Sequence, residues 1–299
     1  MVTSEIFDRH IARIDVGERL STEDIRALAA TPDVLPLGML ADHLRRRLHD
    51  TRVTYVRVAT CRFDQSFADA VPPAAREIII SGAPDTIAIA TAAIKQAKAI
   101  AGERTVSGFS WSDVERLAEH GGQKVSDVLL GWKDAGLDAV ADLSIDLMAE
   151  PAVAIDRLTS AGFQQLCLSI AKAPADQRID VLLRVAQLQD EFACIQAIDP
   201  LPSVLNPLRP TTGYQDVKMV AVARLAAANV PTIQVDWSRY GPKLAQVALT
   251  FGADDIDNVS ASDDAPEGRR RAPLEEIRRN IEAAGFEAAE RDGTFTVIA

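Results

Sequence analysis

The sequence predicts an α/β protein built on a (β/α)8 TIM-type barrel, with an N-terminal helical extension and a C-terminal helix–strand tail. Strand-like and helix-like segments alternate along most of the chain, which is typical of a parallel sheet covered by helices. The strand-like segments number eight, and eight strands close a barrel. The chain has 299 residues and a hydrophobic content of 47%. Both values suit a single barrel with a large core.

The first 50 residues precede this alternation and have helical patterns. Residues 1–17 form an amphipathic stretch, and residues 21–30 begin with a capping box in which Ser21 or Thr22 stands ahead of acidic residues. Residues 37–50 place leucines at helical spacing. We therefore assign residues 1–50 to the helical extension.

Residues 51–260 carry the alternation and form the predicted barrel. The predicted strands cover residues 53–59, 76–82, 104–110, 137–145, 163–170, 192–199, 231–238 and 254–260. The predicted helices cover residues 85–101, 112–136, 151–162, 175–191, 214–230 and 241–253. Several helical segments end in Ala-Gly or Asn, as a helix C-cap should. The pair of glycines in "HGGQ" (120–123) interrupts one helical segment and is typical of a turn.

Residues 261–299 form the predicted tail, which packs on the barrel. A polar, charge-clustered loop covers residues 260–276, and a final helix and a strand at 293–299 follow it.

Charge and cysteine content exclude several classes of protein. The net charge of −11 argues against nucleic acid or an anionic membrane as a partner, because both attract a positive field. No uncharged apolar run approaches the roughly 18–20 residues that span a membrane. The three cysteines are far apart and form no CxxC pair, so we expect no disulfide framework, no structural zinc and a reducing cytoplasm.

The four histidines do not indicate a catalytic or metal site. His10, His43, His49 and His120 lie in helical or N-terminal segments, and we expect each at the surface. A histidine-based nucleophilic triad or a zinc hydrolase is therefore not predicted.

Carboxylates gather where the predicted strands end, which is the end of a barrel that carries chemistry. Asp142, Asp199, Asp236 and Asp257 lie at or near the ends of four strands, and Asp64 follows the first strand. Such carboxylates could hold a hard cation, or they could be solvated loop residues or helix N-caps. The sequence leaves these readings open, and we expect no metal site.

Three stretches together resemble one family. They are residues 35–56 ("LPLGMLADHLRRRLHDTRVTYV"), 178–202 ("RIDVLLRVAQLQDEFACIQAIDPLP") and 213–258 ("GYQDVKMVAVARLAAANVPTIQVDWSRYGPKLAQVALTFGADDIDN"). They are similar to the radical-SAM enzymes of the futalosine route to menaquinone, namely aminofutalosine synthase and dehypoxanthine futalosine cyclase. The resemblance covers nearly the whole chain in order, and it implies a radical-SAM-like barrel.

The family places a CxxxCxxC loop after the first strand, where three thiolates hold a [4Fe–4S] cluster. In the same register this chain has Cys61, Gln65 and Ala68, so the resemblance implies that the cluster is absent. The family's Gly-Gly motif, which meets S-adenosylmethionine, reads here as Ser81 and Gly82. A remaining affinity for S-adenosylmethionine rests on this half-kept motif alone.

The resemblance also points to ligand-binding candidates. Gln196 and Trp237 fall where the family has matching residues near the barrel mouth, and Trp237 could pack under a ligand or fill the barrel top. The full set of ligand-binding candidates is Cys61, Gln65, Ser81, Gly82, Gln196, Trp237 and Asp257.

Two functions follow as hypotheses. The first is a pseudoenzyme, namely a cluster-less paralogue that acts as a non-radical binding, regulatory or partner protein in the futalosine pathway. The second is a re-purposed enzyme, a lyase or transferase, in which Asp64, Asp142, Asp199 or Asp236 does acid–base work on a futalosine-like or chorismate-derived substrate. The expected partners are a small aromatic or nucleoside ligand, an intact radical-SAM homologue, or a second copy of the chain.

Overall fold

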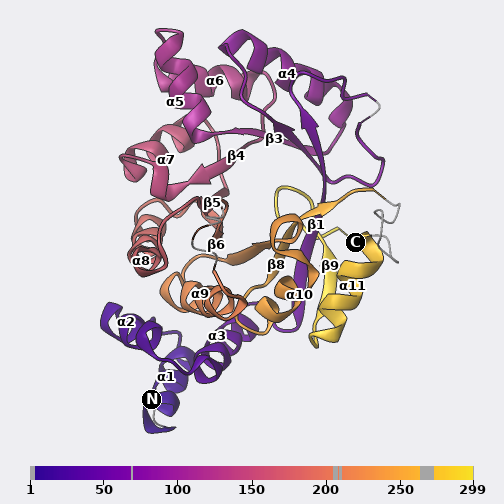
Figure 1. Cartoon of the computed structure of the whole chain (residues 1–299). Helices are drawn as coiled ribbons and strands as arrows, with labels where there is room; N and C mark the ends of the chain where they lie inside the picture. Colours follow the sequence, from indigo (N-terminus) through magenta and orange to yellow (C-terminus); the bar gives the residue numbers. More distant parts are fainter. Residues whose placement is uncertain (1–3, 69, 205–207, 209–210, 263–272, 299) are drawn as a thin grey trace.

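The computed structural model describes residues 4–68, 70–204, 208, 211–262 and 273–298. Eight parallel strands form a closed ring, with helices around its outside (Figure 1). The barrel strands are β1 (Arg52–Arg62), β2 (Glu77–Ser81), β3 (Thr105–Ser110), β4 (Ala139–Ser144), β5 (Leu166–Ile170), β6 (Ile195–Pro202), β7 (Thr232–Asp236) and β8 (Asp255–Ser260). The predicted α/β barrel is confirmed.

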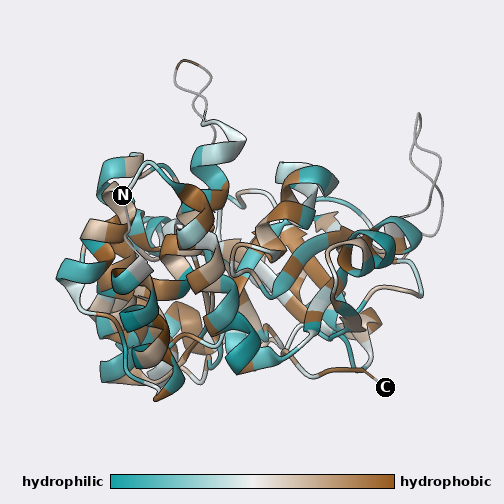
Figure 2. Ribbon diagram, turned by 90° about the horizontal axis from the view of Figure 1, so that it is seen from below, coloured by the Kyte–Doolittle hydropathy of each residue, from teal (hydrophilic) through white to brown (hydrophobic). Residues whose placement is uncertain are grey.

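Helices on the outer surface follow most strands, and brown, apolar residues recur along both the strands and the helices (Figure 2). The barrel helices are α4 (Ile87–Ala101), α5 (Trp111–His120), α6 (Val125–Asp134), α7 (Pro151–Ser160), α8 (Ala175–Phe192), α9 (Gly213–Ala226) and α10 (Trp237–Leu249), with a short 3-10 turn at Ile145–Leu147. The predicted helix 112–136 is divided into α5 and α6, because the chain turns at Gly121 and Gly122, where φ of Gly122 is +60°.

The N-terminal extension consists of α1 (Ser4–Asp15), α2 (Thr22–Ala30) and α3 (Val34–His49). The capping box at the start of α2 is present, since Ser21 and Asp24 exchange side-chain and backbone hydrogen bonds. Leu37, Leu40 and Leu44 are buried in α3, which packs on α9. Burial of each leucine contributes about 1.5–3 kcal/mol, so this stripe fixes the extension to the barrel.

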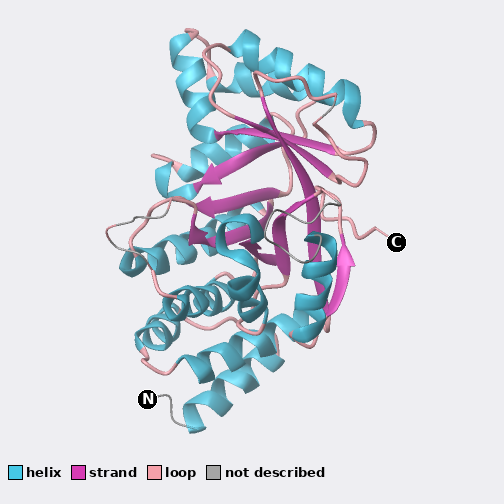
Figure 3. Ribbon diagram, turned by 45° about the vertical axis from the view of Figure 1, so that its right-hand side comes forward, coloured by secondary structure: helices cyan, strands magenta, loops and turns pink. Residues whose placement is uncertain are grey.

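The tail differs from its prediction. Helix α11 (Pro273–Ala283) is followed by β9 (Glu287–Glu290), which runs parallel to the first residues of β1 (Figure 3). The strand predicted at 293–299 is wrong for its described residues, since only an antiparallel bridge between Arg291 and Val297 forms there. The backbone turns at Asp292, whose carboxylate accepts hydrogen bonds from the amides of Thr294 and Thr296. An extended strand cannot form through such a turn.

Strand β1 is central because it pairs with three other strands. It pairs with β8 and β9 over its first half and with β2 over its second half, for example Val58 opposite Glu77. The pairing of β1 with β2 closes the ring.

One histidine expectation is wrong. His10 is only 2% exposed, whereas His120 is exposed. His10 lies on the buried face of α1, and burial lowers the pKa of its imidazole. In the part of the chain that the structure describes, no helix is long and apolar enough to cross a membrane.

Candidate functional site

The interior of the barrel gathers polar side chains from strands that are not neighbours. Glu77 on β2, Cys167 on β5 and Asp257 on β8 interact electrostatically with one another and with Arg291 of the tail. At least one strand separates each pair of these strands in the ring. Their side chains can meet only inside the barrel, so they line its interior.

Solvent reaches this interior. Thr60 and Ile79 lie opposite each other, two residues beyond the pair Val58 and Glu77. Residues two apart on a strand share a face, so Thr60 faces the interior as Glu77 does, and Thr60 is exposed. The Asp257 side chain is 29% exposed. Thr60 and Asp257 therefore provide polar positions in the interior that solvent reaches.

A hydrogen-bonded group stands at the ends of β4 and β5. The Oδ1 atom of Asp142 accepts hydrogen bonds from Ser144 at 2.6 Å and from Ser169 at 2.8 Å, and the two hydroxyls are 2.9 Å apart. The three side chains fix one another, so Asp142 presents its remaining oxygen in a defined direction.

The next strand along the ring contributes Asp199, near the end of β6. Its Oδ1 accepts a hydrogen bond from the Leu201 amide at 3.0 Å. Burial, together with a smaller contribution from the nearby carboxylate of Asp236, raises the pKa of Asp199 to about 8. Asp199 therefore holds its proton at neutral pH and can donate a hydrogen bond.

Asp236 ends β7 and has a structural role. It caps α10 by accepting from the Arg239 amide at 2.8 Å, and its other oxygen accepts from Asn258 at 2.9 Å. The Arg239 guanidinium lies 3.0 Å away. Asp236 is fully engaged, so it supplies charge to the site but no free oxygen.

Two further carboxyl groups come from β2 and β8. Glu77 accepts a hydrogen bond from the Ser107 hydroxyl, and burial together with Asp257 raises the pKa of Glu77 to about 7. Burial raises the pKa of Asp257 to about 6. The sequence reasoning missed Glu77 and Ser107. The available signal was a charged residue at the start of an otherwise apolar strand, "EIIIS".

The loop after β1 has a different character. Cys61 is 3% exposed and packs in the hydrophobic core with Phe67, and burial raises the pKa of its thiol. Gln65 and Ala68 are exposed. The other two cysteines lie on β5 and after α8. The residues of this loop do not fit a [4Fe–4S] cluster, because one buried thiol replaces three convergent thiolates.

Asp64 lies outside the interior group. Its carboxylate forms two hydrogen bonds with Arg62, at 3.0 and 2.8 Å, and both side chains are largely exposed. The hydrogen bond with Arg62 holds the pKa of Asp64 below its usual range. The structure thus separates Asp64 from Asp142, Asp199, Asp236 and Asp257, which it brings together.

Ser81 is the last residue of β2, and Gly82 follows it. The Ser81 hydroxyl donates to the Cys61 carbonyl at 3.3 Å. Gly82 has a φ of +99°, and a Cβ there would lie 2.7 Å from the Phe63 ring. The fold itself requires this glycine, whatever the ligand.

The two remaining ligand-binding candidates are far apart. Gln196 is the second residue of β6, so it lies at the opposite end from the mouth, where its Nε2 donates to Thr232 at 3.4 Å. Trp237 opens α10 on the mouth side and packs against the hydrophobic core. The mouth position expected for Gln196 is thus not observed.

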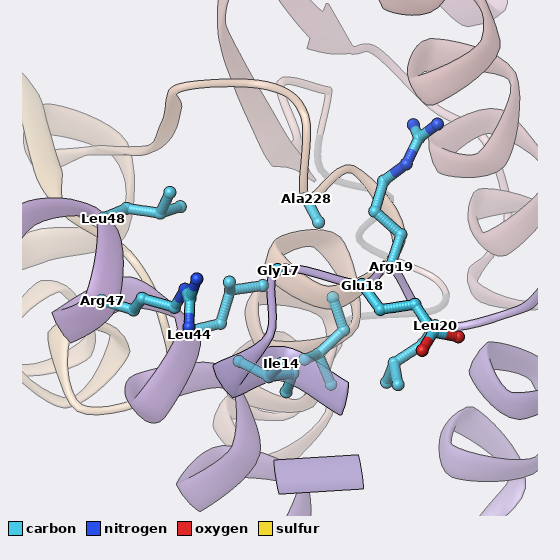
Figure 4. Close-up of a pocket in the computed structure, with 10 residues that line it drawn as sticks. Ile14, Gly17, Glu18, Arg19, Leu20, Leu44, Arg47, Leu48 and Ala228 are labelled. Atoms are coloured by element: carbon cyan, nitrogen blue, oxygen red, sulfur yellow. The ribbon is translucent and has the colours of Figure 1, made fainter. Parts of the chain in front are cut away.

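A cavity of about 110 Å³ lies elsewhere, between the α1–α2 turn, α3 and α9 (Figure 4). Ile14, Leu44 and Leu48 form part of its apolar wall, and Arg19 and Arg47 lie at it. None of the candidate residues lines it. Among the described residues, no group of three or more His, Cys, Asp or Glu side chains is arranged to hold a metal ion.

Comparison with known proteins gives three consistent results. The family model described as the CofH/MqnC C-terminal region matches residues 201–298. The chain is 26% identical to 5-amino-6-(D-ribitylamino)uracil–L-tyrosine 4-hydroxyphenyl transferase of Archaeoglobus fulgidus, over 87% of this chain and 92% of that protein. It is 24% identical to aminodeoxyfutalosine synthase of Streptomyces coelicolor, over 96% of this chain and 92% of that protein.

Solved structures support the fold. The FeFe-hydrogenase maturase HydG of Carboxydothermus hydrogenoformans superposes with a TM-score of 0.68 at 12% identity, over 97% of this chain and 81% of HydG. At this identity the likeness shows the fold alone.

Proposed function

The chain belongs to the futalosine-pathway radical-SAM family, and from this premise we propose that it acts without an iron–sulfur cluster. Its proposed role is that of a non-radical binding, regulatory or partner protein of the futalosine menaquinone pathway. A small polar ligand would bind inside the barrel.

One observation carries this proposal, the loop after β1. Three thiolates are needed to anchor a cluster while one iron stays free. Cys61 is buried among apolar side chains, and Gln65 and Ala68 offer no thiolate. Cys61 and Phe67 thus anchor this loop to the hydrophobic core.

The interior supports ligand binding as the remaining activity. Thr60 and Asp257 leave it open to solvent, and Asp142, Ser169 and Asp199 bring hydrogen-bonding groups to neighbouring strand ends. A ligand site needs a few convergent polar groups that solvent can reach, and this interior provides them.

A second candidate function, acid–base catalysis, is favoured by one specific observation. Asp199 has a pKa raised by burial to about 8, while Asp257 has a lower value of about 6. Two carboxyl groups with separated pKa values can serve as acid and base at neutral pH. The pH experiment described in the Discussion tests the titration of Asp199, on which this candidate depends.

Anaerobic reconstitution with iron and sulfide tests the main proposal. We expect the purified protein to bind no stoichiometric iron and to lack the visible absorption of an iron–sulfur cluster. The control is the double variant Gln65→Cys/Ala68→Cys, which restores the family's cysteine spacing. A stoichiometric cluster in the unchanged protein would refute the proposal.

A further inference from the structure

The C-terminal tail passes beneath the barrel at the N-terminal ends of its strands. The Arg291 amide donates to the Tyr55 carbonyl of β1 at 2.9 Å. Gly293 lies against Thr105, the first residue of β3, and a Cβ on Gly293 would stand 2.6 Å from the Thr105 Cβ. The tail therefore reaches from β1 to β3 across the closed end of the barrel.

From this position the tail sends one side chain into the interior. Arg291 is 2% exposed, and its Nε and Nη2 each donate to one oxygen of Asp255 at 2.7 Å. The Phe295 ring stacks on the guanidinium at 4.0 Å, and the Asp292 carbonyl accepts from Nη1 at 2.9 Å. A bidentate, stacked guanidinium is held in one orientation, which a lysine could not reproduce.

The carboxylate that receives Arg291 is itself fixed. Asp255 is fully buried, and it also accepts hydrogen bonds from Thr54 on β1 and Gln234 on β7. The ion pair thus ties the tail to three strands of the barrel at once.

Further acidic groups face the same guanidinium. Asp257 lies 3.8 Å from Nη2, and Glu77 and the Cys167 thiol are within electrostatic reach. The carboxyl groups come from β8 and β2, on either side of β1. Arg291 is therefore placed where it offsets several negative groups, not Asp255 alone.

We propose that the Arg291 guanidinium is the counter-ion of the carboxyl groups inside the barrel. Residues 287–298 then form the floor of the ligand chamber, and Arg291 sets the charge of that chamber. Arg291 is a positioning residue in this role. The ligand chamber in this inference rests on the proposed function, but the test of the inference needs no ligand.

The charge role has a signature that a packing role lacks. Without the guanidinium, Asp255, Asp257 and Glu77 must stay charged and unpaired or take up protons. Proton uptake is easy at low pH and costly at high pH. Loss of Arg291 should therefore destabilise the protein more at pH 8 than at pH 5.

The experiment compares melting temperatures of the full chain carrying Arg291→Gln or Arg291→Ala at these two pH values. Breaking a buried pair should lower Tm by roughly 10 °C at pH 8 and by clearly less at pH 5. Millimolar guanidinium chloride should raise Tm of Arg291→Ala relative to equal sodium chloride. The control is Arg76→Ala, because Arg76 pairs with Glu290 of the tail and is partly exposed. It should show neither the pH effect nor the rescue.

An equal loss of Tm at both pH values, with no guanidinium rescue, would overturn the proposal. If the single variants do not fold, Asp255→Asn/Arg291→Gln decides, because it removes both charges and leaves amide groups that can still form hydrogen bonds. A folded double variant supports the charge role, whereas an unfolded one counts against it. Neither result bears on iron binding, so this test and that of the proposed function fail separately.

Discussion

The loop after β1 and the interior of the same barrel are built in opposite ways. Cys61 at the end of β1 and Phe67 in the loop pack into the hydrophobic core, whereas Gln65 between them is exposed. The interior keeps Glu77, Asp199 and Asp257 in a polar space that solvent reaches. The difference teaches that one barrel combines an apolar anchor at the end of β1 with polar side chains in its interior.

The contrast between the two regions is tested first by removing the apolar side chain that anchors the loop after β1. Phe67 is completely buried, so Phe67→Ala leaves a cavity and should cost about 3–5 kcal/mol of unfolding free energy. Urea denaturation measures it. The matched change Gln65→Ala, at an exposed position of the same loop, should stay within about 0.5 kcal/mol. Equal effects of the two changes would mean that the loop is not part of the core.

A smaller effect is expected at the end of β2. Gly82→Ala places a Cβ against the Phe63 ring at a positive φ, and we expect a loss of about 1–3 kcal/mol. Combining it with Phe63→Ala should recover the part due to the clash. If the double variant recovers nothing, the backbone conformation alone accounts for the loss.

The last prediction concerns the pH dependence of the interior carboxyl groups. A carboxyl group whose pKa is raised in the folded state binds a proton there more tightly than in the unfolded chain. Its contribution is complete at low pH and is lost as pH rises from about 4 toward 8, given the pKa of about 8 for Asp199. Stability should therefore be higher at pH 5 than at pH 8, and Asp199→Asn should flatten this dependence. The exposed Asp64→Asn serves as the control, and an Asp199→Asn curve parallel to the unchanged protein would contradict the assignment.

Much of the fold follows from local pattern. Apolar strands such as "EIIIS" and the leucine stripe of α3 are predictable from the sequence, because buried residues are apolar and recur at the spacing of the element. The terminal strand was misplaced because a hydrogen-bonded turn at Asp292 interrupts a β-rich stretch.

The site was only partly predictable. Asp142, Asp199 and Asp257 were found because strand ends meet at one side of a barrel. Glu77 and Arg291 were not, since their meeting depends on ring closure between distant strands. The sequence also did not predict that the Cys61 side chain faces the hydrophobic core, because a shift of one residue in strand register moves a side chain to the opposite face.

The pairing of β1 has a consequence for how the chain acquires its structure. Thr54 and Tyr55 pair with Asp255 and Glu290, which lie far from them in the sequence. Until β8 has formed, the edge of β1 that β8 covers is unpaired. Contacts this distant in sequence slow folding, and an open edge invites association with other chains. The contact between α3 and α9 joins distant segments in the same way, so we expect the N-terminal extension and β1 to complete their packing late in folding.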